Sequence, residues 1–205
     1  MAKKFVYHYF NIKGRGEIPR LLFAAAGVEY TDDRIEFSDW PNIKGTTPLG
    51  ALPYLEVDGQ KFPESVAIAR YLANEFGLAG KSNLDKLKID VLVDQMILLR
   101  ESAVTMHFEK DETKKVELMK KFKEEQLPKC FGYIEKALSE NSSGFLVGDQ
   151  LTWGDLALID LDDMLHNFGN LINLDNFPKL TAHKKQIEAS PQISTYLKHR
   201  PVTSH

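Results

Sequence analysis

The sequence runs Ala51-Leu52-Pro53-Tyr54-Leu55-Glu56-Val57-Asp58-Gly59, and Glu64-Ser65 follows shortly after. Tyr54, Leu55 and Val57 favour a strand, and Asp58-Gly59 is a strong signal for a hairpin turn. Pro53 stands directly before this strand, where its missing N–H is tolerated. The Leu52-Pro53 bond can be cis at modest cost. A cis bond would turn the N–H and C=O of Leu52 outward, toward an extended peptide.

A helix is expected directly after the hairpin. From Ser65 onward the apolar residues have helical spacing, at Val66, Ile68, Ala69, Leu72, Ala73 and Phe76. A helix N-terminus beside Glu64 and Ser65 can hold one end of a small zwitterionic ligand. We interpret the segment as half of a peptide-binding site, although an ordinary hairpin leading into a helix explains the same local pattern.

Composition and charge narrow the class of protein. The 205 residues are 43% hydrophobic and 27% charged, which is ordinary for a soluble globular protein. The net charge of −3 gives no basic excess, so we expect neither a nucleic-acid partner nor an anionic membrane. No apolar run approaches the roughly 18–20 residues that span a bilayer, and the start of the chain, Met1 to Tyr7, lacks the long apolar core of a signal peptide.

Cys130 is the only cysteine, which rules out an intrachain disulfide and fits a reducing, cytoplasmic compartment. Its apolar helical neighbourhood favours core packing over catalysis. No group of His and Cys residues has zinc spacing, so we expect no metal.

The first part of the chain, residues 1–76, alternates strands and helices. A strand is predicted over Phe5–Phe10, a helix over Arg15–Ala26, and a second strand over Glu29–Phe37. A loop then leads to the hairpin and to the helix that starts at Ser65. This order predicts a small mixed sheet with helices on its faces.

The second part is helical throughout. After a linker over 77–82, a domain over 83–205 begins with a long helix near Leu84, and a charged turn over Glu109–Thr113 separates it from a second helix that runs to about Leu138. Thr152-Trp153-Gly154-Asp155 is a capping box at the start of another helix. Pro178 and Pro191 mark two shorter helices near the end.

Several collinear motifs then point to one family. They are Tyr9-Phe10-Asn11 followed by Gly14-Arg15-Gly16-Glu17; Asp39-Trp40-Pro41; Pro48-Leu49-Gly50 running into Leu52-Pro53; Leu55 to Gly59; Ser65 to Leu72; Leu151 to Asp155; and Arg200-Pro201. With these motifs spread over nearly the whole chain, the sequence resembles a cytosolic glutathione transferase. It is most similar to the sigma class, which includes the hematopoietic prostaglandin D synthase type.

The resemblance implies an α/β thioredoxin-like N-terminal domain that binds glutathione, followed by an all-α domain that carries much of the electrophile pocket. It implies that Tyr9 is catalytic and donates its hydroxyl to the sulfur of glutathione, the co-substrate. A hydrogen bond to the thiolate lowers the pKa of the thiol, and Arg15 can assist. A strand-end tyrosine packed in the core is the plain alternative.

The remaining glutathione contacts follow from the same resemblance. Leu52 would pair through its backbone with the cysteinyl unit, Trp40 and Lys44 would contact the glycine carboxylate, and Ser65 would take the γ-glutamyl carboxylate. The full set of expected glutathione-binding residues is Tyr9, Arg15, Trp40, Lys44, Gly50, Ala51, Leu52, Pro53, Glu64 and Ser65.

Two positions depart from the sigma pattern. Glu64 stands where a Gln usually precedes the Ser; it cannot donate to a carboxylate but can pair with the γ-glutamyl ammonium. Ile97 and Leu98 stand on the long helix where the sigma pattern often has acidic residues. Because Ile and Leu cannot bind a metal ion, an effect of divalent metals at a dimer interface does not follow from the resemblance.

The resemblance also implies a homodimer and a pocket for a small apolar electrophile. Residues expected to line that pocket are Phe10, Ile12, Arg15, Met106, Ala157 and Leu161, and each of them can equally belong to the ordinary core. Thr105 and Ala157 stand where prostaglandin-specific relatives have large aromatic residues, so prostaglandin specificity does not follow from the resemblance.

The sequence therefore predicts a glutathione transferase that joins the thiolate to apolar electrophiles, with peroxidase activity on organic hydroperoxides as a further expectation. A glutathione-dependent prostaglandin isomerase is one alternative. A non-catalytic structural or ligand-carrying relative is another.

Overall fold

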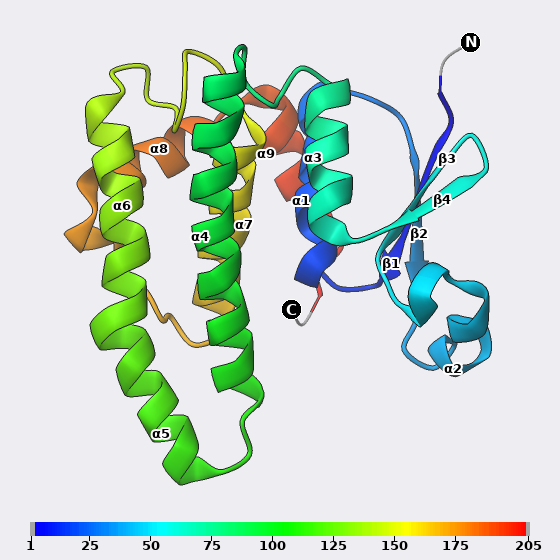
Figure 1. The fold of residues 1–205 in the computed structure, drawn as a ribbon, viewed down its shortest axis with the longest axis horizontal. Helices are drawn as coiled ribbons and strands as arrows, with labels where there is room; N and C mark the ends of the chain where they lie inside the picture. The colour runs from blue at the N-terminus through cyan, green and yellow to red at the C-terminus, as the bar shows by residue number, and fades with distance from the viewer. Residues whose placement is uncertain (1–2, 204–205) are drawn as a thin grey trace. The chain divides into compact units, whose positions relative to one another are not determined.

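The structure of the chain is a computed structural model that describes residues 3–203, with only the backbone at position 175 (Figure 1). Met1 and Ala2 of the expected N-terminal start lie outside the described residues. Contacts between residues divide the chain into two compact units, one formed by Met1–Leu78 with Ser190–His205 and the other by Ala79–Ala189. Sequence pattern alone assigned 190–205 to the helical domain, because a terminal helix carries no local sign of the unit on which it packs.

The first unit is built on a four-stranded sheet with the order β2-β1-β3-β4. Its strands are β1 (Phe5–Phe10), β2 (Thr31–Ile35), β3 (Tyr54–Val57) and β4 (Gln60–Pro63). The pair β1–β2 is parallel, whereas β1–β3 and β3–β4 are antiparallel. The hairpin expected at Asp58-Gly59 is confirmed, because Val57 pairs with Gln60 across it.

Two helices, α1 (Glu17–Ala26) and α3 (Ser65–Glu75), lie side by side on one face of this sheet (Figure 1). The side chains between them and the sheet form the core, where Tyr7, Leu22 and Leu55 are fully buried. A third helix, α9 (Pro191–His199), packs on α1. The predicted thioredoxin-like arrangement of a mixed sheet with flanking helices is confirmed.

Short turns connect the remaining parts of the first unit. A 3₁₀ turn over Gly14–Gly16 precedes α1. Between β2 and β3 the chain forms α2 (Trp40–Ile43) and two further 3₁₀ turns, Lys44–Thr46 and Pro48–Gly50.

The second unit is helical, as predicted. It contains α4 (Asn83–Phe108), α5 (Glu112–Lys121), α6 (Leu127–Glu140), α7 (Trp153–Asn167) and α8 (Pro178–Glu188), with a 3₁₀ turn over Leu174–Asn176. The single helix predicted to reach Leu138 is instead interrupted by a π-helical turn over Phe122–Gln126. Pro128 explains the interruption, because it has no N–H to give to the preceding turn, and the N–H of Leu127 bonds to the carbonyl of Phe122 instead.

The capping box at the start of α7 is confirmed. The carboxylate of Asp155 accepts the backbone N–H of Thr152 at 2.7 Å and its hydroxyl at 2.8 Å. In the same unit Arg100 and Asp160 form a buried ion pair, with Nη2 and Oδ2 2.5 Å apart. No helix within residues 3–203 is both long enough and apolar enough to cross a bilayer.

Candidate functional site

The predicted site residues of the first unit gather at one end of the sheet because of its strand register. His8 pairs with Tyr54, and Tyr54 pairs with Pro63. Tyr9 follows His8, Pro53 precedes Tyr54 and Glu64 follows Pro63, so all three lie at this end of the paired strands. Because β2 runs parallel to β1, the loop that carries Trp40 and Lys44 leaves the sheet at the same end. The hairpin turn at Asp58-Gly59 lies at the opposite end.

The hydroxyl of Tyr9 is held by the loop that follows its own strand. The backbone N–H of Arg15 donates to this oxygen at 3.0 Å, and the side chain is 6% exposed. Such a bond occupies an acceptor lone pair and strengthens the hydroxyl as a donor, because hydrogen bonds in series polarise one another. Tyr9 is thus oriented by a backbone donor from the 3₁₀ turn that precedes α1.

Glycines let this loop approach the tyrosine ring closely. A Cβ on Gly14 would lie 2.7 Å from the hydroxyl oxygen of Tyr9, and one on Gly16 would lie 2.9 Å from its Cγ. Gly14 also has a φ of +43°, in the region that favours glycine. The Gly-Arg-Gly motif is therefore required by the shape of the loop around Tyr9.

Arg20 donates hydrogen bonds to the backbone that leads into the same loop, and the sequence analysis did not predict this role. Its Nη1 donates to the carbonyl of Ile12 at 2.6 Å and its Nη2 to that of Phe10 at 3.3 Å, while Nε donates to Asp32 at 3.0 Å. The side chain is fully buried. A charged residue among the apolar residues of a helix, three positions after Glu17, is the signal that could have identified it.

The Leu52-Pro53 peptide bond is cis, as predicted. Pro53 is buried, Leu52 is half-buried and Ala51 is exposed. The preceding turn is closed by the N–H of Ala51, which donates to the carbonyl of Pro48 at 3.2 Å. The backbone just before β3 is therefore in an irregular, accessible segment rather than inside the sheet.

Trp40 and Lys44 lie on the loop between β2 and β3. The indole of Trp40 meets the ring of Phe10 edge-on, with centroids 5.4 Å apart, and Phe10 in turn stacks on Phe37. Lys44 is exposed, and its Cε lies 3.8 Å from the place of a Cβ on Gly50. The loop thus brings an indole and an ammonium to the same end of the sheet as Tyr9.

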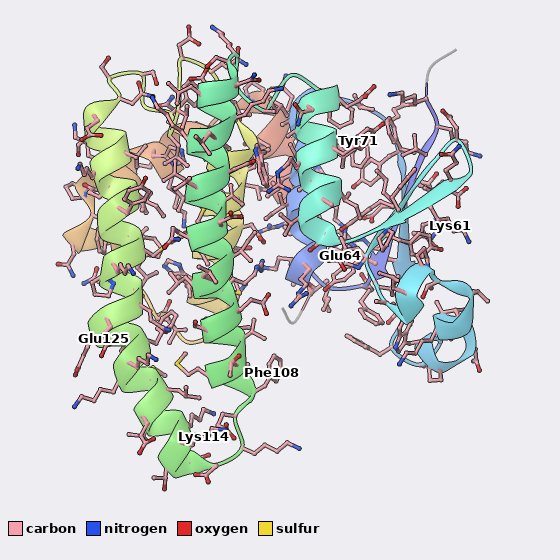
Figure 2. All side chains as sticks on the ribbon, in the orientation of Figure 1. Lys61, Glu64, Tyr71, Phe108, Lys114 and Glu125 are labelled. Carbon is pink, nitrogen blue, oxygen red and sulfur yellow. The ribbon has the colours of Figure 1, made fainter. Side chains whose placement is uncertain are left out.

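Glu64 has an unusual backbone conformation directly before α3. Its φ is +78° and its ψ is +103°, values that cost energy for a residue other than glycine. Its side chain is exposed, and Figure 2 labels it at the start of α3. Ser65 begins the helix and is half-buried. Backbone N–H groups at such a helix start can bind a carboxylate.

The expected electrophile-pocket residues are divided between the two units. Phe10 and Ile12 are half-buried and Arg15 is exposed in the first unit. In the second unit the side chains are almost completely buried, with exposures of 2% for Met106, 3% for Ala157 and 2% for Leu161. This burial fits the core role that the sequence left open for these residues.

The sheet end combines complementary charges around one directed hydroxyl. Arg15 and Lys44 supply cations, Glu64 supplies an anion, and the start of α3 supplies backbone N–H groups. This set of charges is complementary to a small zwitterionic ligand. Among residues 3–203 no group of three or more His, Cys, Asp or Glu side chains is placed to hold a metal ion.

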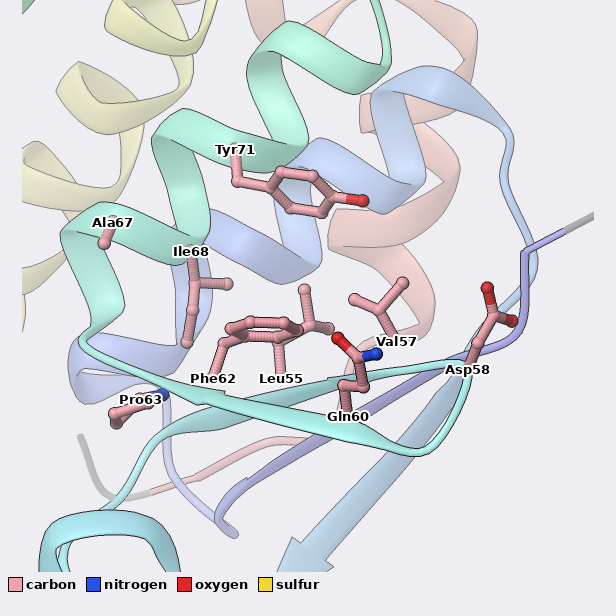
Figure 3. A pocket seen from close by; sticks show the side chains of 9 residues that line it. All are labelled: Leu55, Val57, Asp58, Gln60, Phe62, Pro63, Ala67, Ile68 and Tyr71. Carbon is pink, nitrogen blue, oxygen red and sulfur yellow. The ribbon is translucent and has the colours of Figure 1, made fainter.

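A separate pocket of the first unit contains none of the predicted site residues. It has a volume of about 510 Å³ and lies between the β3–β4 hairpin and α3 (Figure 3). Apolar side chains such as Leu55, Phe62 and Ile68 line it, with Tyr71 on the helix side. No motif in the sequence indicated it.

Comparisons with known proteins agree with this geometry. The models of the glutathione S-transferase N-terminal and C-terminal domains match residues 5–74 and 99–200. S-crystallin SL11 of Nototodarus sloanii is 40% identical over 98% of each chain. Probable glutathione S-transferase 5 of Caenorhabditis elegans is 41% identical over 95% of this chain and 96% of its own.

A solved structure shares the whole fold. The Nu-class GST from Haemonchus contortus is 34% identical, covers 100% of both chains and superposes with a TM-score of 0.91. The thioredoxin-like sheet, the two matching domain models and the relatives of this identity over nearly the full length all lead to the same result: the chain belongs to the glutathione S-transferase family.

Proposed function

We propose that the chain is a catalytic glutathione transferase in which Tyr9 stabilises the thiolate of bound glutathione. The observation that supports this most directly is the 3.0 Å hydrogen bond from the N–H of Arg15 to the Tyr9 hydroxyl. It fixes the oxygen at the end of the sheet where Pro53, Glu64 and Ser65 converge. A tyrosine that only fills the core would not need a backbone donor from the following 3₁₀ turn and two glycines packed against its ring.

In this mechanism the zwitterionic peptide lies extended across the sheet end. Leu52 pairs with it through its backbone, Trp40 and Lys44 contact its glycine carboxylate, and Glu64 and Ser65 hold the γ-glutamyl ammonium and carboxylate. Gly50 and Ala51 shape the turn before the cis proline. The sulfur then lies next to Tyr9 and Arg15.

The chemistry depends on the ionisation of the thiol. A free thiol has a pKa of about 8.5 and is mostly protonated at pH 7. Lowering this pKa by about two units requires roughly 2.7 kcal/mol of preference for the thiolate. A directed O–H, with the positive end of α1 and Arg15 nearby, supplies charge stabilisation of this kind.

The thiolate attacks an electrophilic carbon of the acceptor to form a thioether. In a substitution the leaving group departs with the electrons of its bond to that carbon, and in an addition the acceptor atom that receives the electron pair takes up a proton. With a hydroperoxide the sulfur attacks the outer oxygen and an alcohol leaves, and a second glutathione completes the reduction. The rate enhancement comes from holding a thiolate beside its acceptor. We propose Phe10, Ile12 and Arg15 as the wall that the first unit offers to the acceptor.

The test is a pH titration of the thiol of bound glutathione, followed by thiolate absorbance in the wild type and in Tyr9→Phe. We expect a depressed pKa in the wild type and a value near that of the free thiol in the variant, with similar glutathione affinity. Tyr133→Phe is the matched control, because Tyr133 is 48% exposed on α6. Equal thiol pKa values and equal activity in wild type and Tyr9→Phe would refute the mechanism.

A non-catalytic role is the second candidate, favoured by the 40% identity to a protein named S-crystallin. It predicts that glutathione binds with an unperturbed thiol and that model electrophiles do not react. If glutathione does not bind at all, Glu64→Gln tests whether the departure at this position is responsible.

We further infer a cytoplasmic, sigma-class homodimer that acts in detoxification, on the basis of the family resemblance. The oligomeric state is tested by sedimentation equilibrium, in which a mass that stays at 23.3 kDa over the accessible concentrations contradicts the dimer.

A further inference from the structure

An ion pair joins the end of the chain to the start of α1. Glu17, the first residue of α1, is 1% exposed. Nη1 of Arg200 donates to Oε1 of Glu17 at 2.7 Å. A carboxylate this deeply buried needs a charged partner, because removal of the partner leaves the full desolvation cost uncompensated.

The helix α9 delivers Arg200 to this place. It packs on α1 within the first unit, and Figure 1 shows the two helices beside each other. The backbone N–H of Arg200 donates to the carbonyl of Tyr196 at 2.8 Å, which fixes the residue at the end of α9. Tyr196 itself is largely buried, and burial together with the nearby charge of Glu17 raises the pKa of its hydroxyl.

Glu17 also ends the segment that surrounds Tyr9. Gly16, its neighbour, lies against the Tyr9 ring, and the N–H of Arg15 donates to the Tyr9 hydroxyl. A second cation beside the Glu17 carboxylate is Arg20, whose Nη1 is 3.9 Å from Oε2. Of these two cations, Arg200 makes the shorter contact with the Glu17 carboxylate.

We propose that Arg200 is a positioning residue for Tyr9, acting through Glu17 and the Gly14–Glu17 segment. This inference rests on the proposed function of Tyr9. Arg200 touches neither the hydroxyl nor the expected place of the sulfur. Its role is to hold the backbone that aims the Tyr9 oxygen.

The physical consequence of losing Arg200 follows from the burial of Glu17. Without its partner the carboxylate must either take up a proton or move toward water. Movement displaces Gly16 from the Tyr9 ring and the Arg15 N–H from the hydroxyl. Supporting contacts of this kind matter because a reacting group must be held within about 0.5 Å of its working geometry.

The experiment uses the full chain and compares Arg200→Met, Arg200→Lys and the control Lys198→Met. Lys198 is an exposed cation on the same helix, two residues earlier. For each protein we would measure the pKa of the bound glutathione thiol, the glutathione dissociation constant, kcat and the thermal midpoint. We expect Arg200→Met to raise the thiol pKa by about one unit, which is a tenfold loss of thiolate at low pH, with little change in glutathione affinity.

Arg200→Lys keeps the charge but not the planar fork, so it should recover part of the loss. Lys198→Met should match the wild type in all four measurements. A purely structural role of Arg200 predicts a lower thermal midpoint in Arg200→Met with an unchanged thiol pKa below that midpoint, and this result would overturn the proposal.

A double-mutant cycle separates action through Glu17 from action through other contacts of Arg200. If Arg200 acts through Glu17, then adding Arg200→Met to Glu17→Gln changes the thiol pKa by much less than it does in the wild type. Additive shifts contradict the proposed route. If Arg200→Met does not fold, Arg200→Lys and Glu17→Gln provide the same cycle.

The result also distinguishes this inference from the proposed function. An unperturbed thiol in the wild type refutes the role of Tyr9 itself. A depressed thiol pKa in the wild type that remains equally depressed in Arg200→Met leaves the transferase mechanism standing and refutes only the positioning role.

Discussion

Gly16 lies directly against the ring of Tyr9. A Cβ at position 16 would come 2.9 Å from Cγ of the tyrosine and 3.0 Å from Cε1, and Cβ atoms in folded proteins essentially never come within 3.0 Å of such neighbours. Because Gly16 is buried at the start of α1, neither side of this contact can move without moving the helix start or the ring.

Gly16→Ala should therefore reduce activity by displacing Tyr9. Overpacking of this kind costs about 1–3 kcal/mol of stability, and the displaced hydroxyl loses its alignment with the sulfur. We expect a raised pKa of the bound thiol and a lower kcat, measured together with the thermal midpoint.

Gly132→Ala provides the matched control for this substitution. Gly132 lies within α6, and nothing would approach an added Cβ within 4 Å. A helix-interior Gly→Ala change at an open position should stabilise the protein by about 0.5–1 kcal/mol, with the thiol pKa unchanged. If Gly16→Ala leaves the pKa of the bound thiol and kcat unchanged, as Gly132→Ala should, then the close contact between Gly16 and Tyr9 does not contribute to activity.

Asp155 is the polar centre of the helical unit, and its loss should be severely destabilising. Its carboxylate accepts the N–H of Leu146 at 2.8 Å in addition to the two donors of Thr152, and Nε2 of His183 lies 2.8 Å from Oδ1. Asp155→Ala leaves these buried groups without an acceptor, at a cost of about 3–5 kcal/mol. Chemical denaturation of the two proteins measures the difference.

Asp149→Ala tests whether that cost reflects burial. Asp149 also forms an ion pair, with Lys81 Nζ 2.5 Å from Oδ1, but its side chain is 68% exposed. An exposed pair contributes about 0–1 kcal/mol. Equal destabilisation by the two substitutions would contradict the central role of Asp155.

Elements defined by local pattern could be predicted from the sequence. The strand over Phe5–Phe10 and the hairpin at Asp58-Gly59 each depend on neighbouring residues. Strand β2 was predicted too long, over Glu29–Phe37, because its ends at Thr31 and Ile35 are set by pairing with Val6 and Phe10 of another strand. Periodicity within one segment contains no information about the length of its partner.

The support of the candidate site could not be predicted for the same reason. Glu17, Arg20 and Arg200 appear in the sequence as ordinary charged residues, and only tertiary packing buries Glu17 and Arg20 and brings Arg200 to Glu17. The motif around Tyr9 was apparent from the resemblance, whereas the ion pair that holds its loop joins residues from opposite ends of the chain.

Cys130 should be unreactive in the native protein. The side chain is 4% exposed, and burial raises the pKa of its thiol to about 12. At pH 8 the thiolate fraction is then on the order of one part in ten thousand. We expect a disulfide-type thiol reagent to label the native protein only at the rate of local opening and the denatured protein at once. Rapid stoichiometric labelling of native protein would show that the thiol is accessible.

Glu109 should stabilise the folded protein at neutral pH, and this contribution should decrease as the pH falls into the acid range. Its Oε2 lies 2.9 Å from Nζ of Lys114, and its Oε1 accepts the backbone N–H of Lys110 at 2.8 Å and that of Asp111 at 3.1 Å. The bond from Lys114, followed by those from the two backbone N–H groups, lowers the pKa of Glu109 from 4.5 to about 2.

A depressed folded-state pKa means that the contribution is complete above the unfolded value of 4.5 and disappears as the pH falls through about 2. The thermal midpoint of Glu109→Gln should therefore lie below that of the wild type at pH 7, and the difference should narrow between pH 4.5 and pH 2. Glu117→Gln makes the same chemical change at an exposed position of α5 and serves as the control. Hydrogen bonds donated to a carboxylate stabilise its ionised form more than its protonated form. A difference in thermal midpoint between wild type and Glu109→Gln that stays constant from pH 4.5 to pH 2 would therefore contradict this prediction.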